Sequence, residues 1–150
     1  MPLVDTLPVG SDTAQWSVWS TVARVVVARP DRIGAARELV EAELAAVDRT
    51  ASRFRADSEL MRLAAGVQRV SPLLAELVAA ALAAARETDG DVDPTVGSLM
   101  RRLGYDRDIA ALTVAPAVGA TAAPGWRRLG LDGDMLTLPE GVELDLGATA

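Results

Sequence analysis

The sequence predicts an α+β fold in which one strand and two main helices are followed by a β-hairpin near the carboxyl end. β-Branched residues are concentrated at residues 19–28, helical periodicity follows in two later segments, and apolar residues alternate with polar ones over residues 136–146. Because both helices come between the strands, this order favours α+β over a regular βαβ array. The length of 150 residues is that of one domain.

The composition excludes several classes of function. Half of the residues are hydrophobic but only 3% are aromatic, so Ala, Val and Leu must form most of the core. A net charge of −6 argues against nucleic-acid binding, which needs clustered Lys and Arg. The chain has no His and no Cys, so a metal site would have to hold a hard cation such as Mg²⁺ or Ca²⁺ through oxygen ligands.

The amino-terminal residues predict a flexible lead-in. Residues 1–14 contain Pro, Gly, Ser and Asp in quick succession, so the domain portion is expected to cover residues 15–150. No basic and apolar leader is visible, and no apolar run approaches the roughly 20 residues that cross a bilayer. These features predict a cytoplasmic chain without a membrane span.

The first half of the chain predicts one strand and one helix. Residues 19–28 form the strand, Pro30 ends it, and Asp31 is placed to cap the helix that follows. Charged residues lie between apolar ones that recur at spacings of three and four, which is typical of an amphipathic helix. These apolar residues are Ile33, Ala36, Val40, Leu44 and Val47.

The second half predicts a long helix, two short helices and a hairpin. The long helix begins after its cap Ser71 and runs to about Thr88. Short helices are expected at residues 59–64 and after Thr95, which would cap the latter.

The tail predicts the hairpin from alternating apolar residues. Its strands would be residues 136–138 and 142–146, with a turn at residues 139–141, and residues 113–124 are expected to form a loop before it.

A cluster of oxygen-bearing side chains follows the long helix. Asp91, Asp93 and Thr95 lie in one turn, and Pro94 fixes the local backbone. Turns of this kind hold a hard metal ion or accept a hydrogen bond from a ribose hydroxyl. The same residue types form helix caps and solvated turns, and the spacing leaves both interpretations open.

Two further places carry side chains suited to binding. Asp145 ends a predicted strand and is followed by small residues, which let a phosphate or cofactor approach the backbone, although an ordinary strand exit has the same composition. Trp19 and Phe54 lie in polar surroundings and are suited either to stacking on a planar ring or to a place in the core. No Ser-His-Asp set, Walker loop or GxGxxG motif is present, so no catalytic residue is assigned.

Taken in order, five segments resemble the motifs of the FAD:protein FMN transferases, the ApbE family. Residues 19–21 (WST) fall where the family has Met-Gly-Thr, and residues 52–60 (SRFRADSEL) resemble its Ser-x-Tyr-x-x-x-Ser-Glu-Leu. Residues 90–99 (GDVDPTVGSL) match Gly-x-Phe-Asp-Pro-Thr-Val-Gly-x-Leu. Residues 103–105 (LGY) match Trp-Gly-Phe, and residues 144–150 (LDLGATA) match Leu-Asp-Leu-Gly-Gly-Ile-Ala.

The resemblance implies an enzyme that moves FMN from FAD to a Ser or Thr hydroxyl of an acceptor protein, with Mg²⁺ and release of AMP. It implies that Ala148 offers its backbone carbonyl to the metal. It also implies a set of residues in contact with FAD, which are Trp19, Phe54, Asp91, Val92, Asp93 and Asp145. It names neither the acceptor protein nor the oligomeric state.

The chain departs from the family pattern in side chains and in length. Trp19 and Ser20 replace Met-Gly, Phe54 replaces Tyr, and Val92 replaces Phe, which alters flavin contacts more than the fold. The family's second half, which begins with Lys-Gly and completes the metal site, does not follow Ala150. We therefore expect a truncated chain that binds FAD weakly and does not transfer FMN.

Two alternatives remain open. One is a non-catalytic flavin-binding or interaction module of the same fold, which the substitutions favour. The other is that residues 147–150 (GATA), which resemble a Ser-Gly-Ala-Thr acceptor site, are themselves modified with flavin.

Overall fold

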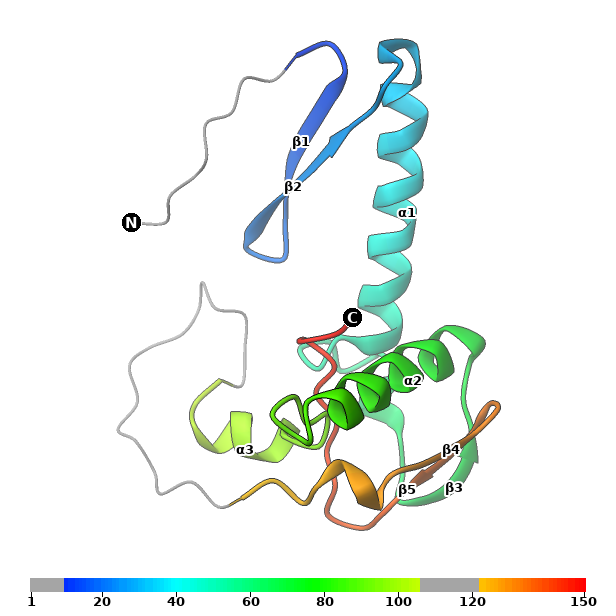
Figure 1. The fold of residues 1–150 in the computed structure, drawn as a ribbon, viewed down its shortest axis with the longest axis vertical. Helices are drawn as coiled ribbons and strands as arrows, with labels where there is room; N and C mark the ends of the chain where they lie inside the picture. Colours follow the sequence, from blue (N-terminus) through cyan, green and yellow to red (C-terminus); the bar gives the residue numbers. More distant parts are fainter. Residues whose placement is uncertain (1–9, 106–121) are drawn as a thin grey trace. The chain divides into compact units, whose positions relative to one another are not determined.

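The structure, a computed structural model, describes residues 10–105 and 122–150 (Figure 1). The chain separates into two compact units, Met1–Ala45 and Ala46–Ala150. Each unit is held by its own contacts. The mixture of helices and short antiparallel sheets confirms the predicted α+β class.

A β-hairpin forms the start of the first unit. β1 (Thr13–Val18) pairs antiparallel with β2 (Thr21–Val26), and Val18 lies opposite Thr21. The strand predicted over residues 19–28 is confirmed for residues 21–26, which form β2, but the prediction is wrong at its start and missed β1. Trp19 and Ser20 form the turn instead, with φ of 47° and 58°, since a two-residue hairpin turn that follows the strand twist needs left-handed backbone.

Part of the predicted lead-in (residues 1–14) lies outside the described residues, and its last two residues belong to a strand. Residues 1–9 lie outside the described part of the chain, whereas Thr13 and Ala14 belong to β1. Their pairing partners, Val26 and Val25, lie across the hairpin.

The long helix of the first half is confirmed as α1 (Ile33–Ala51). It follows a 3₁₀ turn, η1 (Pro30–Arg32), that contains Asp31. The prediction that Asp31 caps α1 is wrong, because its carboxylate accepts hydrogen bonds from the Arg29 guanidinium, at 2.9 Å from Nη2. No residue of α1 is buried, so its apolar stripe is only half-covered.

The second unit contains a three-stranded antiparallel sheet. β3 (Gly66–Arg69) and β4 (Gly130–Asp132) both pair with the central strand β5 (Met135–Leu138). The hairpin of this unit is thus β4–β5, and β3 is a strand that the sequence did not predict.

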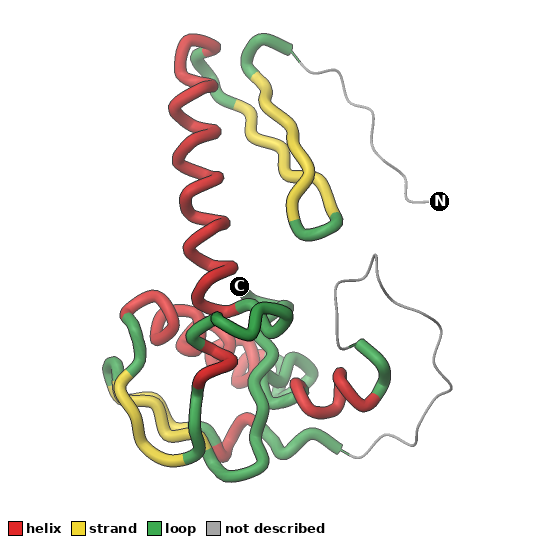
Figure 2. Tube along the Cα trace, turned by 180° about the vertical axis from the view of Figure 1, so that it is seen from behind, coloured by secondary structure: helices red, strands yellow, loops and turns green. Residues whose placement is uncertain are grey.

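Residues 142–146 correct the predicted hairpin, because they are extended but do not form a strand (Figure 2). The alternation of apolar and polar residues still predicted which side chains are buried, since Val142, Leu144 and Leu146 all are. Their backbone bonds with residues 94–97 rather than with β5, as described below.

One helix covers the sheet. α2 (Pro72–Glu87) is confirmed with its predicted cap, as the Ser71 hydroxyl accepts a hydrogen bond from the Leu74 amide at 3.2 Å. In Figure 1, α2 lies across the sheet of β3, β5 and β4. The core between them is aliphatic, and its most buried members are Leu74, Val78, Ala81, Leu136 and Leu146.

Short helical turns complete this unit. η2 (Leu60–Arg62) lies within the predicted helix at residues 59–64, and α3 (Gly97–Arg102) follows the Asp93 turn. Thr95 does not cap α3, whose N-cap position is Val96. The prediction of a loop at residues 113–124 lies mostly outside the described residues; those from 122 to 124 form no regular element before η4 (Trp126–Arg128). Among the described helices, none is both long and apolar enough to cross a membrane.

Candidate functional site

Three of the segments that the sequence singled out come together in the second unit. The Asp145 amide donates a hydrogen bond to the Pro94 carbonyl at 2.9 Å, and the Gly97 amide donates to the Glu143 carbonyl at 3.1 Å. A Cβ on Gly97 would lie 2.7 Å from that carbonyl oxygen, so this close approach requires glycine. The extended tail (residues 142–146) thereby places Asp145 beside the Asp93 turn.

Asp93 uses both of its carboxylate oxygens within the protein. Oδ1 accepts from the Thr95 amide at 2.8 Å and from the Thr95 hydroxyl at 2.6 Å, and Oδ2 accepts from the Trp126 amide at 3.2 Å. The buried Thr95 hydroxyl also accepts from the Gly125 amide at 3.0 Å. These contacts favour the turn-forming interpretation of the cluster, since a ribose or metal would have to compete with them.

Asp145 forms an ion pair that is almost enclosed. Its Oδ2 lies 2.8 Å from Arg53 Nε, and the side chains are only 11% (Arg53) and 13% (Asp145) exposed. Its Oδ1 accepts from the Gly147 amide at 2.9 Å. Arg53 Nη1 donates to the Tyr105 carbonyl at 2.6 Å. One guanidinium therefore joins three segments that lie far apart in the sequence.

Two aromatic rings surround the same guanidinium. Its carbon lies 4.5 Å from the centre of the Phe54 ring and 4.5 Å from that of the Tyr105 ring. The rings themselves meet edge to face, with centres 5.5 Å apart and planes at 77°. Phe54 is 42% exposed, so part of its ring is open to a ligand.

Sequence reasoning missed Arg53 as a site residue. It lies between Ser52 and Phe54 in a segment that the resemblance had marked, but its carboxylate partner is far along the chain. The sequence signal that could have pointed to Arg53 is its place next to an aromatic residue in that segment. The spacing of nearby residues could not have identified its partner, Asp145, because that residue is far along the chain.

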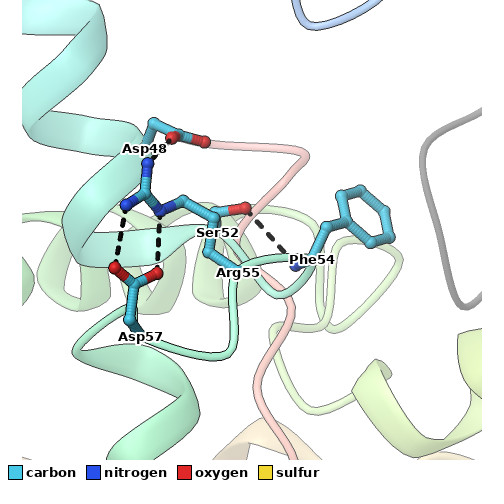
Figure 3. Close-up of polar contacts among 5 residues, drawn as sticks. All are labelled: Asp48, Ser52, Phe54, Arg55 and Asp57. Atoms are coloured by element: carbon cyan, nitrogen blue, oxygen red, sulfur yellow. Dashed lines mark hydrogen bonds and ion pairs between the residues drawn. The ribbon is translucent and has the colours of Figure 1, made fainter.

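The loop that carries Phe54 is tied to the end of α1 by a second, more exposed arginine (Figure 3). Arg55 contacts Asp48 and Asp57, each at 2.9 Å, and the Phe54 amide donates to the Ser52 hydroxyl at 3.3 Å. Hydrogen bonding to Arg55 lowers the pKa of Asp57, and the same contact raises the pKa of Arg55. In Figure 3 the Phe54 ring points away from these ion pairs.

The other predicted contact residues are more peripheral. Asp91 is exposed, and the half-buried Val92 donates its amide to the Thr88 hydroxyl at 3.0 Å. Ala148 is exposed in the turn after Leu146. Trp19 lies in the first unit and is 46% exposed.

The described residues do not supply a magnesium site by themselves. Within residues 10–105 and 122–150, no group of three or more acidic residues gathers in a way that could hold a metal ion. The Ala148 carbonyl alone does not make a donor set for Mg²⁺, which prefers six oxygen ligands in near-octahedral geometry.

A separate cavity lies next to Arg53. It has a volume of about 350 Å³. Arg53 lines this cavity, whereas Phe54, Tyr105 and Asp145 do not. Its other lining residues are mainly aliphatic: Leu60, Met61, Leu63, Leu138, Val142 and Leu144, together with Gly97, Arg101 and Glu143.

Comparison with known proteins identifies the family. The family model described as "ApbE family" matches residues 17–150. The chain belongs to the ApbE family. This match covers the segments that surround Arg53 as well as the hairpin turn at Trp19.

Solved structures of ApbE proteins have the same fold. Flavinyl transferase ApbE from Pseudomonas stutzeri, in its apo form, superposes with a TM-score of 0.71 at 22% identity, covering 91% of this chain and 49% of that one. The ApbE protein from Thermotoga maritima gives 0.72 at 22% identity, with coverage of 91% and 47%. A mutant of flavin transferase ApbE from Vibrio cholerae gives 0.69 at 22% identity, with coverage of 91% and 51%.

The present chain thus spans about half the length of the ApbE structures that it matches. No curated protein matches the sequence.

Proposed function

We propose that this chain is the FAD-binding portion of a flavin transferase that moves FMN from FAD to a Ser or Thr hydroxyl of an acceptor protein. The observation that carries this proposal is the convergence of three ApbE-type segments on Arg53, which contacts Phe54, Tyr105 and Asp145. The Asp145 amide in turn bonds to the Pro94 carbonyl, next to Asp93. Membership of the ApbE family and the names of its structural neighbours support the same reaction class.

The site has features that suit FAD. The open part of the Phe54 ring offers an apolar surface to a planar ring, as stacking requires. Beyond Asp145 the chain continues into an exposed turn of small residues, Gly147 and Ala148, where a phosphate group could approach the backbone closely. In the proposed reaction an acceptor hydroxyl attacks the FMN phosphorus and the bridging P–O bond breaks. AMP leaves with the electron pair of that bond, and the hydroxyl proton passes to the solvent.

Magnesium belongs to this proposal as well. A divalent cation on a pyrophosphate neutralises charge that develops during transfer. The Ala148 carbonyl would be one ligand, and further oxygen ligands would have to come from outside the described residues. We therefore propose that the chain binds FAD weakly by itself and does not transfer FMN by itself.

A second candidate is a flavin-binding module without transfer activity. It is favoured by the internal contacts of Asp93 and Asp145, whose carboxylates are both occupied by protein donors or by Arg53. A site whose acidic groups only hold the backbone in place could bind flavin without taking part in chemistry.

The experiment is a titration with FAD followed by a transfer assay. Binding is measured by calorimetry, and transfer by covalent flavin fluorescence in a denaturing gel after incubation with an acceptor protein, FAD and either Mg²⁺ or EDTA. We expect saturable FAD binding and no covalent flavin on the acceptor. Absence of saturable binding would contradict the proposed function, and Mg²⁺-dependent labelling would contradict the proposed inactivity. Covalent flavin fluorescence on the chain itself would support the alternative that residues 147–150 are modified with flavin.

A further inference from the structure

Arg53 makes several contacts in the second unit besides its ion pair with Asp145. Its Nε faces the Asp145 carboxylate, its Nη1 donates to the Tyr105 carbonyl, and its plane lies near two aromatic rings. Its Nη2 is buried and has no hydrogen-bond partner among the described residues. The side chain thus connects the loop that carries Phe54 with the end of the α3 segment and with the tail.

The geometry requires the planar guanidinium rather than positive charge alone. A lysine ammonium could reach Asp145, but it has no planar group to stack between the rings and cannot present donors in fixed directions at the same time. Enclosure of the pair also makes its loss costly, because removing one partner leaves the other charge uncompensated in a nearly buried place.

We propose that Arg53 is a positioning residue for ligand binding, which holds the Phe54 ring and the Asp145 carboxylate in one fixed arrangement. This inference rests on the proposed function. Phe54 is 42% exposed, and its ring meets the Tyr105 ring edge to face. Arg53 contacts both rings and therefore sets the angle at which Phe54 meets a ligand.

The ligand group that this arrangement would serve is a planar heteroaromatic ring on a phosphate. FAD carries two such rings, the isoalloxazine and the adenine, and both stack on an aromatic face. FMN and AMP present these rings separately, so titration with each of them distinguishes the two sources.

A fluorine label tests the positioning directly. The chain contains one Phe, so 4-fluorophenylalanine reports only Phe54. We expect Arg53→Gln and Arg53→Lys to move the fluorine resonance, because both remove the guanidinium from the ring. The matched control is Arg101→Gln, which breaks the exposed pair between Arg101 and Glu143, two residues before Asp145.

Binding and thermal unfolding are measured on the same variants. We expect Arg53→Lys to remain folded with a melting temperature close to that of the unmodified chain, yet to bind FAD about tenfold more weakly, because misplacement of a positioning group weakens productive binding. Arg101→Gln should bind FAD as the unmodified chain does. The weakening should recur with whichever of FMN or AMP uses the Phe54 ring.

Each outcome decides the inference. A folded Arg53→Lys variant with a moved resonance and weakened binding supports it, even if Arg53→Gln does not fold. Unchanged resonance and FAD affinity in Arg53→Lys overturn it, because charge alone would then suffice. If the unmodified chain fails to bind FAD, the proposed function fails and the assignment of Arg53 to ligand positioning fails with it, whatever the fluorine resonance does.

Discussion

Two arginines next to Phe54 have different environments, and this difference determines what each can do. Arg53 is nearly enclosed and joins Asp145, Tyr105 and two rings. Arg55 is more open to solvent and contacts Asp48 and Asp57. Solvent screens the Arg55 pairs, so we expect them to affect stability modestly and in a manner that depends on pH and salt.

The lowered pKa of Asp57 gives a pH prediction with a definite sign. Because the folded state releases the Asp57 proton more readily than the unfolded state, the contribution is present above the unfolded pKa of about 3.9 and is lost as pH falls through the lower folded pKa. The free energy of unfolding of the unmodified chain should exceed that of Asp57→Asn near neutral pH. Denaturant titrations from neutral to strongly acidic pH should show this gap closing, and a pH-independent gap would contradict the assignment.

The cap of α2 gives a second prediction for a single residue. Ser71→Ala removes the acceptor of the Leu74 amide, together with the hydroxyl that donates to the Glu59 carboxylate, and should lower the free energy of unfolding by about 1 kcal/mol. Urea unfolding measures the change. Ser17→Ala, at an exposed position of β1, is the matched control and should have a smaller effect. An equal effect of both substitutions would mean that the cap contributes little.

Among the elements, the start of α3 and the tail are held together by a contact that only glycine allows. Gly97→Ala would place a Cβ 2.7 Å from the Glu143 carbonyl, and the tail would have to move. We expect a loss of about 1–3 kcal/mol in the free energy of unfolding, which is the range for an overpacked site. Because Asp145 follows in the same segment, FAD binding should weaken too.

The control for this substitution is Gly34→Ala in α1. A Cβ there meets no atom within 4 Å, and alanine is favoured over glycine inside a helix. Gly34→Ala should therefore be neutral or stabilising by up to about 1 kcal/mol. Thermal unfolding of both variants checks the pair, and a Gly97→Ala variant as stable as Gly34→Ala would show that the tail does not rely on this close contact.

The long helices and the strands β2 and β5 could be predicted from sequence, whereas β1, β3 and β4 could not. α1 and α2 repeat their apolar residues over several turns, and Ser71 marks the beginning of α2 directly. β3 has four residues, begins with glycine and pairs with β5, far along the chain, so nothing local marks it. In residues 142–146, alternation predicted burial correctly but could not identify the pairing partner, because that partner is set by tertiary contacts.

At the scale of the whole molecule, the second unit brings Phe54, Asp145 and the Asp93 turn together, and the chemistry of this site is a proposal. The order of motifs was sufficient to predict the family, which the match over residues 17–150 shows. The same motifs predicted Phe54 and Asp145 as residues in contact with FAD. Arg53, which contacts both of them, was identified only from the fold. Roles of individual residues in FAD contact remain predictions.

The most direct test of the central claim is a map of where FAD binds. The amide spectrum of the ¹⁵N-labelled chain is recorded by NMR during a titration with FAD. The account predicts saturable shifts at Phe54, Tyr105 and Gly147, with little change at Val67 on the exposed part of β3. Saturable shifts that spare residues 52–57, 103–105 and 144–148 altogether would contradict it.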